Sequence, residues 1–216
     1  MITVITGLAG SGKTWLMTRL ILKEYRAGTD VYINFPVYFP NNNDRVFRWN
    51  SLAETYNIKN GIIAIDEGQK LFNARLWNIL PMSFSEKISQ HRHHFVDIMT
   101  TTQDLGMIDI NMRRNIHELY DCKSVFRFPK NYKVQPIFQM IRVVKKQRNM
   151  DMNNITWEKT ASKIHFISKM WTKELYNTYG NLDLPNFLCH IKREKGKWKG
   201  AIYSREIYNS KSKASW

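Results

Sequence analysis

The chain has 216 residues and a formal net charge of +15. Because 43% of its residues are apolar, it can bury the core of one large domain or of a domain with an appendage. Its two cysteines, Cys122 and Cys189, are too few for a disulfide framework and lack metal-site spacing, which indicates a reducing compartment and buried thiols. No apolar run approaches the roughly 18 residues that cross a bilayer, so we expect a soluble protein.

The first predicted element is an apolar strand over residues 2–6, and a glycine-rich segment follows it at once. That segment matches the phosphate-loop pattern G-x-x-x-x-G-K-[ST] and lies between a strand and a helix, as the motif requires. Its glycines allow successive backbone N–H groups to turn toward phosphate oxygens. A plain strand-to-helix turn is the alternative. We predict a nucleoside triphosphate bound by the residues Gly7, Ala9, Gly10, Ser11, Gly12, Lys13 and Thr14.

Two side chains of this loop have specific expected roles. Lys13 would neutralise the β- and γ-phosphates, and the hydroxyl of Thr14 would hold a magnesium ion. The expected cofactors are therefore ATP and Mg2+, although the motif does not distinguish ATP from GTP.

The elements after the loop are read from periodicity and turn residues. Near-helical spacing of apolar residues predicts a helix over 13–26 that stops near Gly28. Residues 31–33 predict a second strand and residues 46–49 a short one. Asn50 or Ser51 would cap a small helix that runs through Tyr56.

An apolar run over residues 61–65 is typical of a central parallel strand, and Asp66 and Glu67 follow it directly. This is the form of a Walker B element. Asp66 would bind the magnesium ion or one of its waters, and Glu67 would orient or deprotonate the attacking water. A surface acidic pair that closes a strand is the alternative, but a phosphate loop earlier in the chain favours nucleotide hydrolysis.

Further along, residues 83–94 predict a helix, residues 96–102 a strand and residues 109–116 another helix. Gln103 ends this strand. Its amide could reach the γ-phosphate or the attacking water, or it could simply cap the segment that follows.

The arginines and histidines close to this strand in sequence allow two interpretations each. Arg113 and Arg114 are the candidates for an arginine finger offered to a neighbouring subunit, with Arg75 and Arg92 in reserve; solvent-facing side chains are the alternative. The histidines within residues 91–94 lack the spacing and the cysteines of a zinc site. A polar helix end, or a patch that faces DNA or another subunit, fits them better.

Strands that alternate with helices predict an α/β fold with a mostly parallel sheet, whose ligand lies at the carboxyl ends of the strands. We assign residues 1–128 to this core and residues 129–216 to a small β/α extension. The sequence predicts a strand within 124–128, another strand over 137–144, a helix over 168–179 and strands or a hairpin over 191–203 that turn near Gly196.

The basic charge lies almost wholly in the second half. Residues 1–125 hold 14 Lys and Arg against 12 Asp and Glu, whereas residues 126–216 hold 19 against 6. Clusters at 145–148 and 192–199 would attract a phosphate backbone, and Trp198 could stack on an unpaired base. We therefore expect DNA binding through the C-terminal half, with a merely solvated basic surface as the alternative.

These motifs, taken in order, resemble the zonula occludens toxin-like family, the assembly ATPases of filamentous phages within the FtsK/HerA superfamily of DNA-pumping motors. The resemblance covers roughly residues 1–128 and is carried by the order and spacing of its parts. Those parts are the phosphate loop, Ile65-Asp66-Glu67, His91-Arg92-His93, Thr101-Thr102-Gln103 and Arg113.

The resemblance implies a RecA-like core, hydrolysis of Mg-ATP, ring-like homo-oligomers with hexamers favoured, and work at the inner membrane during extrusion of single-stranded phage DNA. Phage coat, assembly or capsid proteins are the implied partners. Such proteins usually continue into a membrane-spanning helix, which no apolar run here matches. We therefore expect a motor in the host cytoplasm that docks peripherally at the inner membrane or on a capsid partner.

The functional prediction is an oligomeric ATPase that couples hydrolysis to genome export or virion assembly. A soluble viral genome-packaging ATPase is a related alternative. A nucleotide-gated interaction protein that moves nothing is an alternative from another class. A kinase that shares the phosphate loop is disfavoured, because it needs a lid over its acceptor and gains little from a basic C-terminal half.

Overall fold

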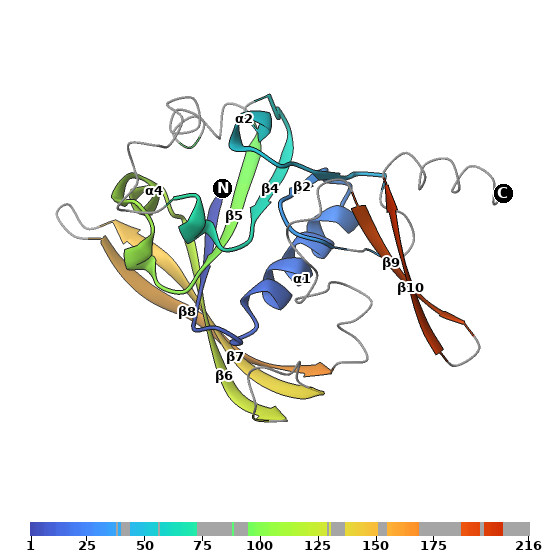
Figure 1. Cartoon of the computed structure of the whole chain (residues 1–216). Helices are drawn as coiled ribbons and strands as arrows, with labels where there is room; N and C mark the ends of the chain where they lie inside the picture. Colours follow the sequence, from blue (N-terminus) through green and yellow to red (C-terminus); the bar gives the residue numbers. More distant parts are fainter. Residues whose placement is uncertain are drawn as a thin grey trace.

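One large sheet organises the molecule (Figure 1). The computed structural model describes residues 1–37, 39, 44–55, 57–72, 88, 95–128, 130, 137–150, 155–168, 187–194 and 197–204, the last two ranges by their backbone alone. The sheet contains eight strands: β1 (Ile2–Thr6), β2 (Val31–Ile33), β3 (Val46–Arg48), β4 (Gly61–Ile65), β5 (Val96–Thr102), β6 (Glu118–Phe128), β7 (Phe138–Met150) and β8 (Ile155–Ser168).

The strands follow the order β3-β2-β4-β5-β1-β6-β7-β8 across the sheet. All pairs from β3 to β6 are parallel, whereas β7 and β8 are added in antiparallel orientation. The predicted α/β class with a mostly parallel sheet is confirmed. Because β5 lies between β1 and β4, the strand that ends in Gln103 separates the phosphate-loop strand from the strand that ends in Asp66.

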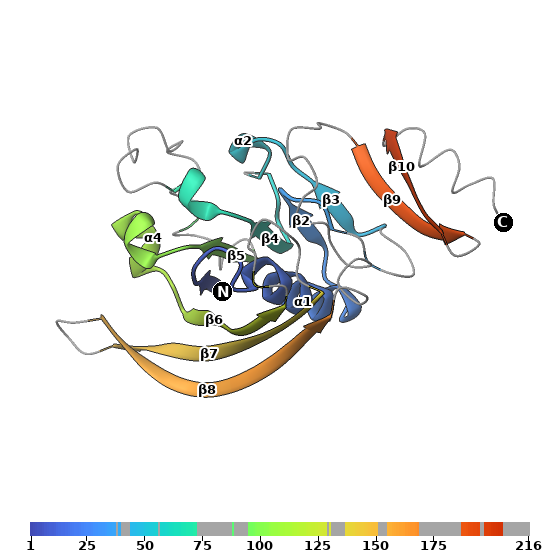
Figure 2. The ribbon, with the colours of Figure 1, turned by 60° about the horizontal axis from the view of Figure 1, so that its bottom comes forward.

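Helices and short turns cover the two faces of the sheet. On one face lies α1 (Lys13–Arg26); the other elements are α2 (Leu52–Thr55), α4 (Ile110–Arg114) and the 3-10 turns η1 (Gly68–Lys70) and η3 (Leu105–Met107). A separate antiparallel hairpin is made by β9 (Phe187–Glu194) and β10 (Lys197–Ser204). In Figure 2 the strands β6 to β8 curve beneath α1, with the concave side of the curve toward the helix.

Two apolar clusters hold these layers together, one on each face of the sheet. The first packs α1 residues such as Met17 and Ile21 against Ile5, and it extends to Ile141 of β7. The second joins the opposite side chains of the parallel strands to Phe72 and to α4. Burial on both faces explains why β4 is continuously apolar in sequence and why β1 contains only isoleucine, valine and threonine.

Most predicted elements agree with the structure, and α1 spans the predicted residues. β6 starts at Glu118, earlier than predicted, and β8 was not predicted at all. The alternation of apolar and polar residues is interrupted in β8, because most of its described side chains are exposed and many are charged or polar. The predicted helices over 83–94 and 168–179 lie outside the described residues, apart from residue 88 and from residue 168, which ends β8.

The proposed division after residue 128 stays a prediction. The strands β7 and β8 belong by sequence to the basic extension, yet they continue the sheet of the core through a long antiparallel pairing with β6. Residues of the predicted extension therefore contact the core directly, as the site below shows.

Candidate nucleotide-binding site

The phosphate loop connects β1 to α1 with a backbone that depends on glycine. Gly7, Gly10 and Gly12 have φ angles of 145°, 73° and 87°, and Gly12 forms the N-cap of α1 in a left-handed conformation. A Cβ atom built on Gly7 would lie 2.3 Å from the carbonyl oxygen of Cys122 in the neighbouring strand β6. Only glycine fits this position, so the sheet and the loop are closely packed where the strand ends.

The loop has the features of an anion cradle. Within the described residues, the buried hydroxyl of Ser11 has no hydrogen-bond partner. The N-terminus of the 14-residue helix α1 opens at the same place and has no acidic residue in its first turn. A helix N-terminus with free donors favours a phosphate group, so this loop fits the triphosphate that the sequence predicts.

The ammonium group of Lys13 lies across the loop. Its Nζ donates a hydrogen bond to the carbonyl oxygen of Leu8 at 3.0 Å. Burial lowers the pKa of Lys13, while the nearby carboxylates of Asp66 and Glu67 oppose this shift. Negative phosphate oxygens would strengthen the charged form of this lysine further.

Asp66 lies against Thr14, as a shared metal requires. The hydroxyl of Thr14 donates to both carboxylate oxygens of Asp66 at 3.2 Å, although 52 residues separate the two in sequence. Burial raises the pKa of Asp66, and hydrogen bonds from Thr101 and Thr14 counteract this rise. A hydroxyl and a carboxylate are hard oxygen ligands of the kind that Mg2+ prefers, so this donor set fits the predicted ion.

Two residues that hold Asp66 in place had no role assigned to them from the sequence. The hydroxyl of Thr101 in β5 donates to Asp66 at 2.6 Å and accepts from the backbone N–H of Glu67 at 2.8 Å. The side chain of Asn34, just after β2, accepts from the backbone N–H of Asp66 at 2.7 Å and donates to its carbonyl oxygen. Both follow or end parallel strands that reach the same edge of the sheet, which is the signal that would have found them.

Glu67 follows Asp66 in a strained conformation. Its φ angle of 53° is left-handed, which is uncommon for a residue with a side chain and recurs at functional sites. The carboxylate of Glu67 is partly exposed and forms an ion pair with Lys70 of η1. In this arrangement Glu67 follows Asp66, the predicted metal ligand, and is held by a cation of its own turn.

Gln103 lies in a hollow of about 410 Å³ that also includes Gly7 and Leu8 of the phosphate loop. The side chain of Asp104, not that of Gln103, caps the turn η3 by accepting from the N–H of Gly106. The capping alternative for Gln103 is therefore wrong for this turn. Its exposed amide stays available at the edge where the loop begins.

A third missed residue, Gln139 of β7, supports the phosphate loop from behind. Its side chain is 4% exposed and donates to the carbonyl oxygen of Gly10 at 2.5 Å and to the hydroxyl of Ser124 at 3.1 Å. Methyl groups of Ile141 and Ile167 lie against the Cα of Gly12, since a Cβ atom there would meet them at 3.0–3.3 Å. The antiparallel strands thus form the rear wall of the loop, a role that no local pattern signals.

Arg113 and Arg114 do not lie beside the phosphate loop of their own chain. The helix α4 leads into the start of β6, where the N–H of His117 donates to the carbonyl oxygen of Ile2. Ile2 begins β1, whereas the phosphate loop follows the end of β1. The length of this strand, about five residues at roughly 3.3 Å each, therefore separates the edge of the sheet near α4 from the edge near the loop. Any contact of these arginines with a γ-phosphate would come from another subunit.

The basic cluster over 145–148 is partly neutralised by neighbours in β6 and α4. Lys145 pairs with Glu118 at 2.6 Å, and Lys146 pairs with Asp121 at 3.6 Å. Arg148 donates to the carbonyl oxygen of Arg114. These cations therefore brace the sheet as well as contribute to its positive surface.

The remaining sequence predictions have separate outcomes. Arg75, Arg92 and the histidines within 91–94 lie outside the described residues, as do the side chains of the 192–199 cluster. In the ranges that the structure describes, no three His, Cys, Asp or Glu residues gather as a metal site. Cys122 is buried and its thiol pKa is raised to about 12 by burial, as expected of an unreactive cysteine. None of the helices in those ranges has the length and apolar character that a bilayer crossing demands.

Comparison with known proteins agrees with this geometry. The family model of the zonular occludens toxin (Zot) matches residues 1–166. No curated protein sequence matches the chain. Among solved structures, the N-terminal domain of the zonular occludens toxin from Neisseria meningitidis is 21% identical, with a TM-score of 0.52 over 82% of this chain and 98% of that one. This likeness confirms the predicted RecA-like P-loop NTPase fold.

Two more distant structures are also similar. The DNA-packaging ATPase B204 from Sulfolobus turreted icosahedral virus is 14% identical, with a TM-score of 0.46 over 76% of this chain and 96% of that one. The flagellar accessory protein FlaH from Methanocaldococcus jannaschii is 11% identical, with a TM-score of 0.48 over 76% of this chain and 83% of that one.

Proposed function

This chain belongs to the zonular occludens toxin family, and we propose that it is a Mg2+-dependent ATPase of the FtsK/HerA type that moves or exports a phage or viral genome. One observation carries the proposal. The hydroxyl of Thr14, at the end of the phosphate loop, lies 3.2 Å from both carboxylate oxygens of Asp66. An ion that bridges these groups would stand where the β- and γ-phosphates of a bound nucleotide need a counter-charge.

Each residue of the site has a task in this proposal. Lys13 and the backbone of the loop hold the phosphates, Thr14 and Asp66 hold the ion, and Glu67 orients the attacking water. The magnesium ion supplies a Lewis acid that neutralises charge on the γ-phosphoryl oxygens. Because Lys70 binds the carboxylate of Glu67, this glutamate must exchange that partner for the water before hydrolysis.

The assembly in this proposal is a homo-oligomeric ring, with a hexamer favoured, that works in the host cytoplasm or peripherally at the inner membrane. Arg113 or Arg114 completes the site of a neighbouring subunit. Both lie in α4 just before the start of β6, at the edge of the sheet that lies away from the loop. DNA binds through the basic C-terminal half, and phage coat or capsid proteins are the partners.

The first experiment is an ATPase assay of the full chain and of Lys13→Ala, with and without single- or double-stranded DNA. Loss of a preorganised positive group at the phosphates lowers turnover by about 100-fold or more, while the thermal melt stays that of the natural chain. We expect DNA to stimulate the natural chain only. Unchanged hydrolysis by Lys13→Ala would contradict the assignment of the loop.

A nucleotide-gated interaction protein is the second candidate. It is favoured by the pairing of Lys145 and Lys146 with Glu118 and Asp121, which reduces the positive charge that β7 offers to DNA. Such a protein would hydrolyse ATP at a rate that DNA leaves unchanged and a protein partner alters. The DNA arms of the same assay therefore separate the two candidates.

A further inference from the structure

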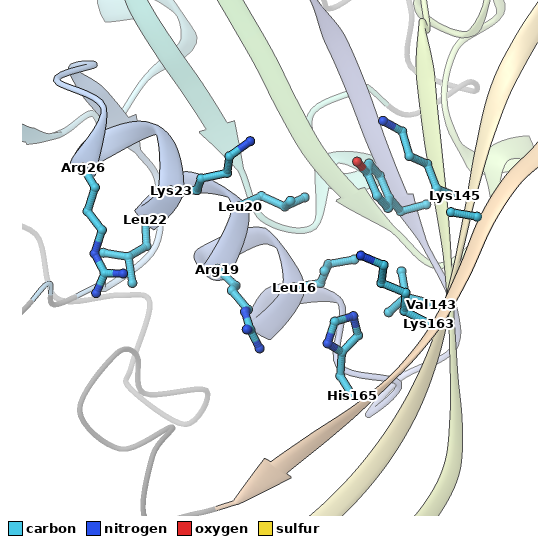
Figure 3. A pocket seen from close by; sticks show the side chains of 12 residues that line it. Leu16, Arg19, Leu20, Leu22, Lys23, Arg26, Val143, Lys145, Lys163 and His165 are labelled. Atoms are coloured by element: carbon cyan, nitrogen blue, oxygen red, sulfur yellow. The ribbon is translucent and has the colours of Figure 1, made fainter.

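A second concave site lies behind the phosphate loop, between α1 and the antiparallel strands. It is a groove of about 540 Å³, and its lining residues differ from those of the nucleotide site (Figure 3). Its floor is aliphatic and includes Leu16, Leu20 and Val143. We refer to it as the α1–β8 groove.

Cations line both walls of the α1–β8 groove. Arg19, Lys23 and Arg26 come from α1, and Lys145 and Lys163 come from β7 and β8; among the described residues, no acidic side chain lines the groove. Arg19 lies over the ring of Trp15 at 5.3 Å, a contact that fixes its position on the wall.

Several of these charges have no compensating partner. Lys145 pairs with Glu118 and Lys23 with Glu24, but in the part of the chain that the structure describes no carboxylate pairs with Arg19, Arg26 or Lys163. Burial, Arg19 and Lys163 together lower the pKa of His165, which favours its neutral form. The groove therefore offers an apolar floor between uncompensated cations.

We propose that the α1–β8 groove binds an acidic amphipathic helix of a partner protein. Apolar side chains of that helix would cover the leucines, and its carboxylates would meet the cations on either wall. Arg19, Lys23 and Arg26 lie at i, i+4 and i+7, so they rise along about 10 Å of α1. A helix with acidic residues at the same spacing would match them, which is the arrangement of groove-bound helices in general.

Other anionic partners fit the groove less well. A nucleic-acid backbone gains little from an aliphatic floor. Unpaired bases stack on a series of aromatic side chains, whereas the described residues that line this groove are mainly leucines, valine and cations, with the rings of Tyr120 and His165 among them. A bilayer is broad and flat, so its headgroups would reach the rim but not the floor between the two walls. An amphipathic helix meets both kinds of surface at once.

The location gives such a partner access to the nucleotide site. Lys13 and Thr14 start α1, and Leu16 on the next turn lines the groove. Ile167 of β8 packs against Gly12, two residues beyond the groove residue His165. A bound helix would therefore bridge the two elements that carry the phosphate loop and its rear wall.

The test uses the full chain and a fluorescein-labelled helical peptide with leucine on one face and glutamate at i, i+4 and i+7. The matched peptide has lysine in place of each glutamate. We expect anisotropy to report binding of the glutamate peptide, weakened by salt, and none of the lysine peptide. The double variant Arg26→Glu/Lys163→Glu should lose affinity by at least about tenfold, because like charges then face each other. The control Lys59→Glu, an exposed lysine outside the groove, should stay within about twofold.

A floor variant separates the possible partners. Leu20→Ser should weaken binding of the glutamate peptide. It should leave unchanged any binding of a single-stranded DNA oligonucleotide or of phosphatidylglycerol vesicles. If the double variant melts early, its two single variants are measured instead. The proposal is overturned if both peptides bind equally, if no groove variant alters binding, or if DNA or vesicles displace the peptide and lose affinity with Leu20→Ser.

Peptide binding at the α1–β8 groove can be tested independently of the proposed motor function. Lys13→Ala should retain peptide binding, since its ammonium group lies outside the groove. Loss of hydrolysis without loss of peptide binding, or the reverse, shows which of the two proposals has failed.

Discussion

At the scale of single residues, Asp66 concentrates the chemistry of the site. Its carboxyl group is enclosed at the end of β4, where Thr14 and Thr101 donate to it and Asn34 binds its backbone. Burial raises its pKa, so the charge that we propose to bind a metal is costly to hold in the fold. A buried charge that destabilises the fold is what the proposed metal-binding role of Asp66 would require.

We predict that Asp66→Asn loses hydrolysis but melts at a higher temperature at neutral pH. The amide keeps an acceptor for Thr14 and Thr101 without the buried charge. Activity should fall by about 100-fold or more, the size typical of a lost electrostatic group. Paired ATPase assays and thermal melts check this, and Asp97→Asn, at an exposed position in β5, is the control. A lower melting temperature would show that the carboxylate stabilises the fold.

The pH dependence of this difference has a definite sign. A carboxyl whose folded pKa is raised binds its proton more tightly in the fold, so the natural chain loses stability as pH rises from 3.8 through the raised folded value. Asp66→Asn has no carboxyl group at this position and therefore lacks this loss of stability. We expect the two melting temperatures to converge at acidic pH, to separate as pH rises from 3.8 through the raised pKa, and to keep a constant gap above it. A gap that is the same at all pH values would rule out ionisation of Asp66 as its cause.

At the scale of elements, the strand β7 is the unexpected support of the phosphate loop. Gln139 and Ile141, neighbours on one side of this strand, contact Gly10 and Gly12. Both side chains are buried, so the strand and the loop share one packed interface. The antiparallel addition therefore takes part in the nucleotide site of the parallel core.

We predict that Gln139→Ala raises the KM for ATP several-fold with a smaller change in kcat. The loop loses its tether at Gly10, while the phosphate ligands themselves remain. Gln139→Glu should be worse than alanine, because a carboxylate cannot donate to the Gly10 carbonyl oxygen and repels phosphates. Initial rates across ATP concentrations measure this, and Gln147→Ala, exposed on the same strand, is the control. Equal kinetics for the alanine and glutamate variants would indicate a packing role only.

At the scale of the whole molecule, the sheet separates the nucleotide edge from the edge that carries α4. Arg113 precedes β6, and His117 contacts the first residue of β1 rather than its last. Since these edges are opposite, one chain holds a loop at one end and a candidate finger at the other. Subunits arranged head to tail would bring the two together.

We predict that Arg113→Ala alone is inactive and that mixing it with Lys13→Ala restores part of the activity. In the mixture, an intact loop of one variant can meet an intact arginine of the other. An arginine finger contributes about 10³-fold or more to turnover, so restoration is easily measured. Arg26→Ala is the control and should be active by itself. An inactive mixture that still forms oligomers on a sizing column would exclude Arg113, and the same mixing with Arg114→Ala then tests its neighbour.

Sequence alone was sufficient for the local parts of this protein. The phosphate loop, its strand and helix, and the acidic end of β4 are contiguous patterns in which each residue's role follows from its neighbours. Periodicity likewise found most of the parallel strands, because burial on both faces leaves a continuous apolar run. It missed β8, whose many exposed and charged side chains blur the alternation that marks a strand.

Tertiary structure decided everything that depends on distant segments lying together. Thr101 and Asn34 reach Asp66, Gln139 reaches Gly10, and α1 forms a groove with β8 only because strand order and register bring them to one place. A sequence pattern records the spacing of residues within one element, whereas these contacts depend on pairings between elements up to 129 residues apart. No local propensity encodes such pairings, since they are set by the packing of the entire sheet.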